Sequence, residues 1–197
     1  MSSDLEPRIK GAAIQDFFTW YAEEFGEDAM ATIWARLPDR VRADLGPSYS
    51  KLLAFHWYPA SATHSALDLV LERHTAQEHE QLAQQGARVV IGKTLRGLYR
   101  TIFKTLVSPS RYLRTVNTVW KAFHDTGHIE TRELGPAHHY SELHGWRAPH
   151  AFIERLNGFA AKEIYEAMGC RAVSFEQTHG TDDRGEPTYV MNMRWKP

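Results

Sequence analysis

Residues 168–195 read Met-Gly-Cys-Arg-Ala-Val-Ser-Phe-Glu-Gln-Thr-His-Gly-Thr-Asp-Asp-Arg-Gly-Glu-Pro-Thr-Tyr-Val-Met-Asn-Met-Arg-Trp, and this stretch decides the fold. Val173 and Phe175 stand on one face of its first run. The apolar residues of its second run also alternate with polar ones, which is the period-two pattern of half-buried strands. The residues between the runs are rich in Gly, Asp and Pro, as turns are. We therefore expect an antiparallel hairpin whose turn lies within Gln177–Pro187.

A helix is expected directly before this hairpin. One apolar stripe at steps of three and four is formed by Phe152, Leu156, Phe159, Ala160 and Ile164. Gly169 stands where a helix commonly ends. A helix packed over a two-stranded hairpin buries both apolar faces at once. The last fifty residues therefore form one helix-and-hairpin unit.

Most of the chain upstream has helical periodicity. The apolar spacing predicts helices over 10–25, 27–37, 61–85, 89–107 and 109–123. Gly86 is expected to end the third, and the last starts at Ser108 and Pro109. Residues 51–59 stay undecided between a helical turn and an extended segment, and 129–134 with 138–143 predict a second hairpin. We expect an α+β fold in one domain, 1–197. It has a mostly helical N-terminal part of about 10–125 and a small antiparallel sheet packed on helices over about 128–196.

Length and composition indicate what kind of protein this is and in which compartment it is expected. With 197 residues the chain can bury a core without disulfides or metals, and its single cysteine, Cys170, excludes an internal disulfide. The first residues lack the apolar core of a signal peptide, and no later run approaches the roughly 18 apolar residues of a membrane span. These features favour a cytoplasmic protein.

The formal net charge of -1 is unevenly distributed. Residues 81–124 contain eight basic residues and no acidic one, so the rest of the chain is acidic. Four of the cations, at steps of three, four and four, fall within roughly 80° of one another on the helix predicted over 89–107. This basic stripe consists of Lys93, Arg96, Arg100 and Lys104. Together with Arg111 and Arg114 on the next helix, it predicts a docking surface for an acidic protein partner or a phosphate-bearing ligand.

No pattern of catalytic or metal-ligating residues stands out. His64, Asp68 and Glu72 follow at steps of four, but a solvated helix face explains the same spacing, and the sequence has no His-Glu-x-x-His. It also lacks the Gly-x-Ser-x-Gly of serine hydrolases and the glycine-rich loops that bind phosphates. Nothing in the sequence favours an enzyme, and we predict no catalytic residue and no metal site.

The order of helices, strand pair, helix and closing hairpin resembles the fold shared by haem-nitric-oxide-binding domains, 4-vinyl-reductase-type domains and TRAPP-like transport-particle subunits. It also resembles uncharacterised proteins of this plan from myxobacteria. The similarity covers most of the chain and is strongest from Pro109 to Trp195. It implies a ligand-binding or interaction domain of bacterial signalling, although fold alone does not transfer function.

The family's haem chemistry matches this sequence poorly. Trp120 is the best match to the histidine that holds iron in the haem-binding relatives, and Tyr140-Ser-Glu-Leu-His retains only the tyrosine of their Tyr-x-Ser-x-Arg motif. We therefore expect no cofactor, and no haem held by the family histidine. An internal apolar pocket, as relatives of this fold use, would here be lined by Trp120, Phe123 and Tyr140.

Two functions remain open. The first is a non-enzymatic regulatory or interaction domain that presents the basic stripe to an acidic partner. The alternative is a small-molecule sensor that binds an apolar or tetrapyrrole-like ligand in the internal pocket. Exposed apolar edges would also suit a homodimer.

Overall fold

The N-terminal part of the protein is a bundle of helices. The structure, a computed structural model, describes residues 6–96 and 108–196. A short strand β1 (Arg8–Lys10) leads into α1 (Gly11–Phe25), α2 (Glu27–Arg36) and α3 (Asp39–Leu45). The 3-10 helix η1 (Tyr49–Lys51) and strand β2 (Trp57–Pro59) follow, and then come α4 (Ala60–Leu71) and α5 (Ala76–Arg96). The segment that stayed undecided in the sequence thus contains a strand, and β2 pairs antiparallel with β1.

Two predicted helix boundaries are wrong. The single helix expected over 61–85 is divided at residues 72–75 into α4 and α5, and α5 continues through Gly86 to Arg96. Gly86 is needed for packing rather than for ending the helix, because a Cβ there would lie 2.7 Å from Cε2 of Phe17 on α1. The absent side chain lets α1 approach α5 closely. The remainder of the helix predicted over 89–107 lies outside the described residues.

The C-terminal part is a four-stranded antiparallel sheet with two helices. It begins with α7 (Pro109–Phe123), which Ser108 caps through its side chain, and continues with β3 (His128–Gly135) and β4 (His138–His144). Helix α8 (Ala151–Ala167) then precedes β5 (Arg171–Thr181) and β6 (Pro187–Lys196). The strand order is β3-β4-β6-β5, so β6 pairs with both β4 and β5. The predicted α+β class is confirmed, and the closing turn lies at residues 182–186, inside the predicted window.

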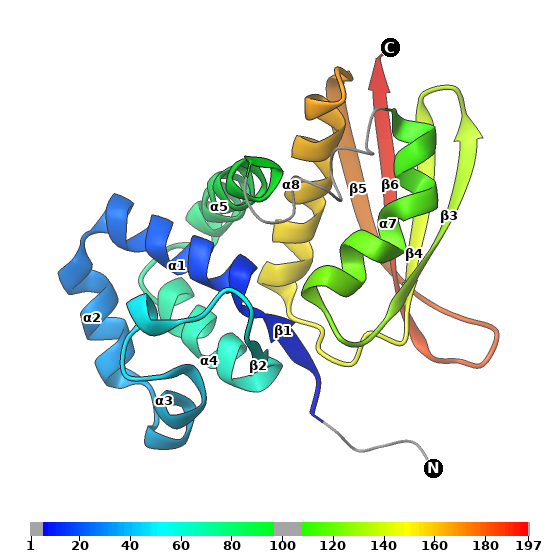
Figure 1. Cartoon of the computed structure of the whole chain (residues 1–197). Coiled ribbons are helices and arrows are strands. Elements are labelled where there is room, and N and C mark those ends of the chain that lie inside the picture. The colour runs from blue at the N-terminus through cyan, green and yellow to red at the C-terminus, as the bar shows by residue number, and fades with distance from the viewer. Residues whose placement is uncertain (1–5, 97–107, 197) are drawn as a thin grey trace.

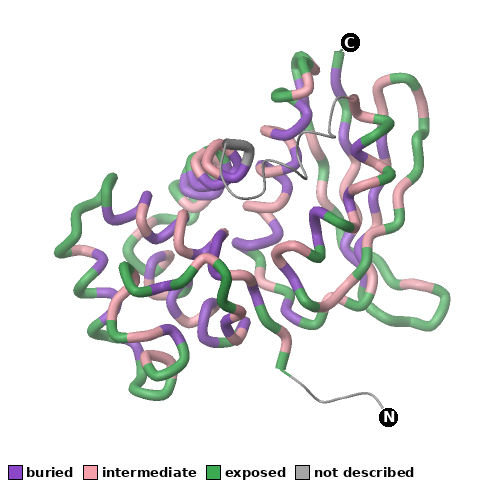
Figure 2. Tube along the Cα trace, in the orientation of Figure 1, coloured by how far each residue is buried: buried purple, intermediate pink, exposed green. Residues whose placement is uncertain are grey.

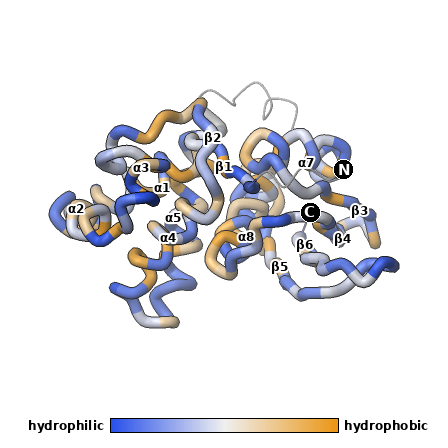
Figure 3. Tube along the Cα trace, turned by 90° about the horizontal axis from the view of Figure 1, so that it is seen from below, coloured by the Kyte–Doolittle hydropathy of each residue, from blue (hydrophilic) through white to orange (hydrophobic). Residues whose placement is uncertain are grey.

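Helices α5 and α8 join the two parts. Figure 1 shows α1–α4 grouped at one end and the sheet at the other, with α5 and α8 between them, and buried residues follow these two helices in Figure 2. Gly158 allows α8 to lie close to β5, because a Cβ there would come within 2.4 Å of the Phe175 ring. The turn between β5 and β6 projects from this body and is hydrophilic (Figure 3).

A second junction lies at the end of α7. The residue after the helix, His124, forms an isolated antiparallel bridge with Ile9 of β1. Next to it, Arg8 donates from its backbone N–H and its guanidinium to the carboxylate of Asp125, at 2.7 and 2.8 Å. The first strand of the chain therefore fixes the C-terminal end of α7 to the helical part.

Candidate functional site: a cavity beneath α7

An apolar cavity of about 130 Å³ lies between α5, α7, α8 and the inner face of β4 and β6. The helices line it with branched and aromatic side chains and with the small Ala160 and Ala161, and the strands contribute Ser141, Leu143 and Met191. The two hydrophobic clusters of the C-terminal part, one centred on α7 with α8 and one on Trp120, surround it. We call this space the central cavity.

His124 is the notable polar residue of the central cavity. It is 7% exposed, and its ring stacks on that of Trp120 at a centroid distance of 3.9 Å and an interplanar angle of 15°. Within the described part of the chain, its Nδ1 is buried and has no hydrogen-bond partner. Burial lowers the pKa of His124 to about 3, while the charge of Asp125 raises that pKa by less and His64 lowers it slightly further. The imidazole is therefore neutral at physiological pH.

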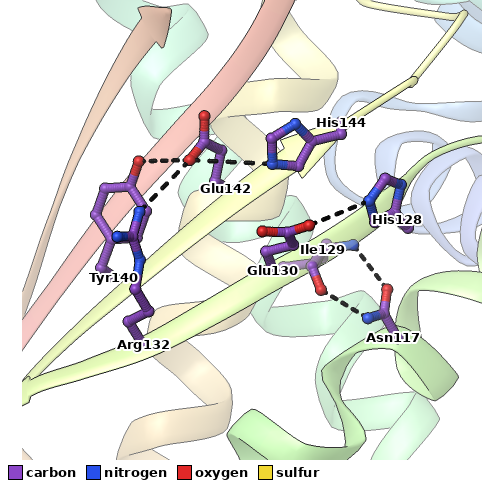
Figure 4. Close-up of polar contacts among 8 residues, drawn as sticks. All are labelled: Asn117, His128, Ile129, Glu130, Arg132, Tyr140, Glu142 and His144. Atoms are coloured by element: carbon purple, nitrogen blue, oxygen red, sulfur yellow. Dashed lines mark hydrogen bonds and ion pairs between the residues drawn. The ribbon is translucent and has the colours of Figure 1, made fainter. Parts of the chain in front are cut away.

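Helix α7 is held against the sheet by one amide side chain. Asn117 donates from Nδ2 to the carbonyl oxygen of Ile129 at 2.6 Å, and its Oδ1 accepts from the Ile129 N–H at 2.7 Å (Figure 4). Thr131 adds a hydrogen bond from its hydroxyl to the Leu113 carbonyl. These contacts set the distance between α7 and β3, and with it the width of the central cavity.

The structure brings two of the three predicted pocket residues together. Trp120 and Phe123 line the central cavity. Tyr140 does not, because strand residues alternate between faces and its neighbours Ser141 and His139 take the inward positions. Its hydroxyl instead donates to Glu142 on the outer face at 2.8 Å, and the guanidinium of Arg132 lies over its ring (Figure 4). The prediction of Tyr140 as a pocket residue is therefore corrected.

The basic stripe is only partly described. Lys93 has a carboxylate neighbour from another helix, because its Nζ lies 3.7 Å from Oδ1 of Asp16 on α1. This neighbour comes from tertiary packing, so the spacing within the helix could not reveal it. The side chain of Arg96, and all of Arg100 and Lys104, lie outside the described residues. The other two predicted cations, Arg111 and Arg114, are exposed on α7.

Sequence reasoning missed His124. It directly follows the helix predicted to end at Phe123, so it was not counted among the apolar residues that identified Trp120 and Phe123. Its only local signal was its spacing of four from Trp120, which places the two rings over each other when the helix continues. The tertiary bridge to Ile9, which turns this position inward, leaves no mark in the local sequence.

Of the comparisons with known proteins, only the one with solved structures found matches. No family model matches the chain, and no curated protein matches its sequence. Among solved structures, the Fe(II) unliganded H-NOX protein from K. algicida superposes with a TM-score of 0.67 and 12% identity, over 95% of this chain and 97% of that one. The fold is that of the H-NOX domains. A point mutant of the T. tengcongensis H-NOX has a TM-score of 0.65 and 12% identity, over 95% and 98% of the two chains.

A further H-NOX structure corrects the prediction about cofactors. It is an oxygen complex of an oxygen-binding H-NOX domain related to soluble guanylate cyclases, with a TM-score of 0.64, 11% identity and 95% coverage of both chains. Another H-NOX structure addresses haem distortion in that family. The prediction of no cofactor and no haem is therefore wrong as it was argued. It depended on Trp120 in place of one histidine, whereas the H-NOX fold of this chain brings another histidine, His124, to the central cavity.

The residues of the central cavity meet one requirement for haem and leave a second unmet. A neutral imidazole with an unused nitrogen is the commonest axial ligand of haem iron, and His124 supplies it. The volume is too small, since about 130 Å³ compares with about 150 Å³ for an engineered cavity that binds benzene and about 300 Å³ or more for drug-sized ligands. A single apolar ring fits as the cavity stands, and a tetrapyrrole requires α7 and α8 to separate.

In residues 6–96 and 108–196, none of the helices is long and apolar enough to cross a membrane. Nor does this part of the chain contain three or more histidine, cysteine or acidic side chains already converging on a metal position.

Proposed function

We propose that this protein is a sensor domain that binds an apolar ring ligand in the central cavity beside His124. Single rings are one candidate class. Haem is the larger candidate: His124 would hold its iron, and α7 and α8 would have to separate to admit it. The observation that carries the proposal is the unpartnered Nδ1 of His124 in a mostly apolar cavity. Leaving a buried polar atom unsatisfied costs about 1–3 kcal/mol, so such atoms usually have a purpose or a partner. Haem, when bound, would supply an iron centre for a diatomic gas.

The chain's own residues have separate tasks in this proposal. His124 is neutral because its pKa is depressed, so one of its two ring nitrogens has a lone pair to offer. Trp120 fixes the imidazole by stacking on it, and its own Nε1 donates to the carbonyl of Thr126 at 2.8 Å, so the indole is also fixed. The leucine, valine and alanine walls exclude water from the ligand.

The test is a titration of the purified protein with haem, followed by the Soret band. Wild type should bind one equivalent, and His124→Ala should lose or shift the band of the ligated iron. His128→Ala is the matched control, because that imidazole is 55% exposed on the outer face of the sheet and should bind haem as wild type does. A second variant, Ala161→Leu, keeps His124 but fills the cavity, so it should also weaken binding.

The outcomes separate the two ligand classes. If haem does not bind while benzene-sized aromatics shift the melting temperature of wild type but not of Ala161→Leu, the cavity is a sensor site for single rings. If neither class binds, or if His124→Ala and Ala161→Leu bind haem as wild type does, the proposal fails.

We propose a second role for the outer face of α7, as a docking surface for an acidic partner. Arg111 and Arg114 are exposed there, and none of the described carboxylates forms an ion pair with them. The opposite face of the same helix carries Trp120 and lines the central cavity. One helix would thus contact both the ligand and the partner. Part of the basic stripe belongs to residues outside the described ranges, so Arg111 and Arg114 carry this proposal.

A further inference from the structure

A pair of histidines lies between the helical part and the start of α8. His64 belongs to α4, and His150 is the residue directly before α8. Their ring centroids are 4.6 Å apart and their planes are inclined by 35°. Each ring has one buried nitrogen, Nε2 of His64 and Nδ1 of His150, that finds no hydrogen-bond partner among the residues described.

A carboxylate orients one member of the pair. Nε2 of His150 lies 3.1 Å from Oδ1 of Asp68, one turn further along α4 from His64. An ionised carboxylate only accepts hydrogen bonds, so the proton of His150 belongs on Nε2 and the lone pair on Nδ1. A histidine that donates from one nitrogen to a carboxylate and keeps the other nitrogen free has the arrangement of a metal ligand with its outer-shell partner.

His64 also has a buried nitrogen, Nε2, without a partner among the described residues. The side chain of His150 is 13% exposed while that of Asp68 is 63% exposed, so solvent reaches the edge of the pair. An ion could enter from the side of Asp68.

The separation of the rings agrees with two imidazoles on one ion. With nitrogen–metal distances of about 2.0–2.1 Å and ligand angles of about 90–110°, the two ring centroids would be about 4.5–5.2 Å apart. The observed 4.6 Å falls within this range. We propose that His64 and His150 bind one divalent transition-metal ion such as Zn²⁺, with Asp68 positioning His150.

The chemistry of the pair limits the metal. Imidazole nitrogen suits zinc, copper, nickel and iron, whereas Mg²⁺ and Ca²⁺ prefer oxygen ligands. Because no third histidine, cysteine or acidic side chain of the described chain converges here, water would complete the coordination shell. The site would fix α4 to the start of α8. Its residues do not line the central cavity, although His64 lies near enough to His124 to affect the pKa of that residue.

The test uses tag-free, full-length protein dialysed against a chelator. Zn²⁺ binding is measured by calorimetry, and Co²⁺ provides a visible spectrum that reports nitrogen coordination. Wild type should bind one ion, and His64→Ala or His150→Ala should weaken binding at least as much as the loss of an outer-shell partner, about 10–100-fold. Asp68→Asn should lose about 10–100-fold as well, and this exposed residue can change without harm to folding.

Controls decide whether the binding is specific. His56→Ala and His179→Ala remove exposed imidazoles elsewhere and should leave Zn²⁺ affinity unchanged, and Mg²⁺ should not bind. Circular dichroism checks that each variant is folded, with His150→Gln replacing His150→Ala if the latter is not. The proposal is overturned if wild type binds no Zn²⁺, or if folded His64→Ala and Asp68→Asn variants bind it as wild type does.

Discussion

Asn117→Ala should destabilise the protein, because the Asn117 side chain connects α7 to β3. Asn117 makes two hydrogen bonds, 2.6 and 2.7 Å long, to the carbonyl and N–H of Ile129, and alanine removes both. A neutral hydrogen bond contributes about 0.5–1.5 kcal/mol, and the two backbone groups left behind lose a partner on the free edge of β3. We expect the free energy of unfolding to fall by about 2–3 kcal/mol, which corresponds to about 4–12 °C in melting temperature for a chain of this size.

Urea unfolding followed by circular dichroism measures this change. Thr118→Ala is the matched control, because Thr118 is the exposed next residue of the same helix and should change stability by less than about 0.5 kcal/mol. Asn117→Asp keeps the acceptor and loses the donor, so it should fall between wild type and alanine. Hydrogen exchange at the Ile129 amide should quicken in Asn117→Ala. If Asn117→Ala is no less stable than Thr118→Ala, the two hydrogen bonds between Asn117 and Ile129 contribute nothing to stability.

Three other perturbations have defined outcomes. Gly86→Ala should lower the free energy of unfolding by about 1 kcal/mol. Crowding of the new Cβ against Phe17 costs about 1–3 kcal/mol, whereas the higher helix propensity of alanine stabilises the protein by about 1 kcal/mol. A variant that is more stable than wild type in urea unfolding would contradict this. Because His124 has a folded pKa of about 3 against an ordinary 6.5, the unfolded chain binds more protons between these values, so stability should fall as the pH drops from 6.5 towards 3. His124→Gln should flatten that dependence, as measured by urea midpoints. Arg111→Glu with Arg114→Glu should abolish salt-sensitive capture of an acidic partner in pull-downs while folding is retained, and unchanged capture would leave these cations as solvated surface.

Local sequence patterns predicted the fold class because its elements are strongly periodic. The alternation in residues 171–195 and the helical stripe ending at Gly169 needed no tertiary information, and both elements are present. The division between α4 and α5 was missed because the break at residues 72–75 contains neither Gly nor Pro. Gly86 was misread because a glycine that admits a neighbouring helix looks, in sequence, like one that ends its own helix.

The candidate site was less predictable than the fold. Trp120 and Phe123 were found because cavity walls and core share the same apolar stripe. The prediction for Tyr140 failed because motif matching ignored the alternation of the strand, which turns its side chain away from the helices. The environment of His124 depends on Ile9, more than a hundred residues earlier in the chain. A contact of that range is set by folding and leaves no local pattern.

The alternation of β4 also bears on how such a domain can diversify. Ser141 and Leu143 face the central cavity, while Tyr140 and Glu142 belong to the polar network outside, although all four are consecutive in one strand. Substitutions at the odd positions can therefore alter which molecule the interior accepts and leave the exterior as it is, and those at the even positions do the reverse. Insertions are different, because a shift by one residue exchanges the two sets of side chains. Point mutation can thus explore new ligands and new surfaces independently, whereas a change in the length of this strand alters both at once.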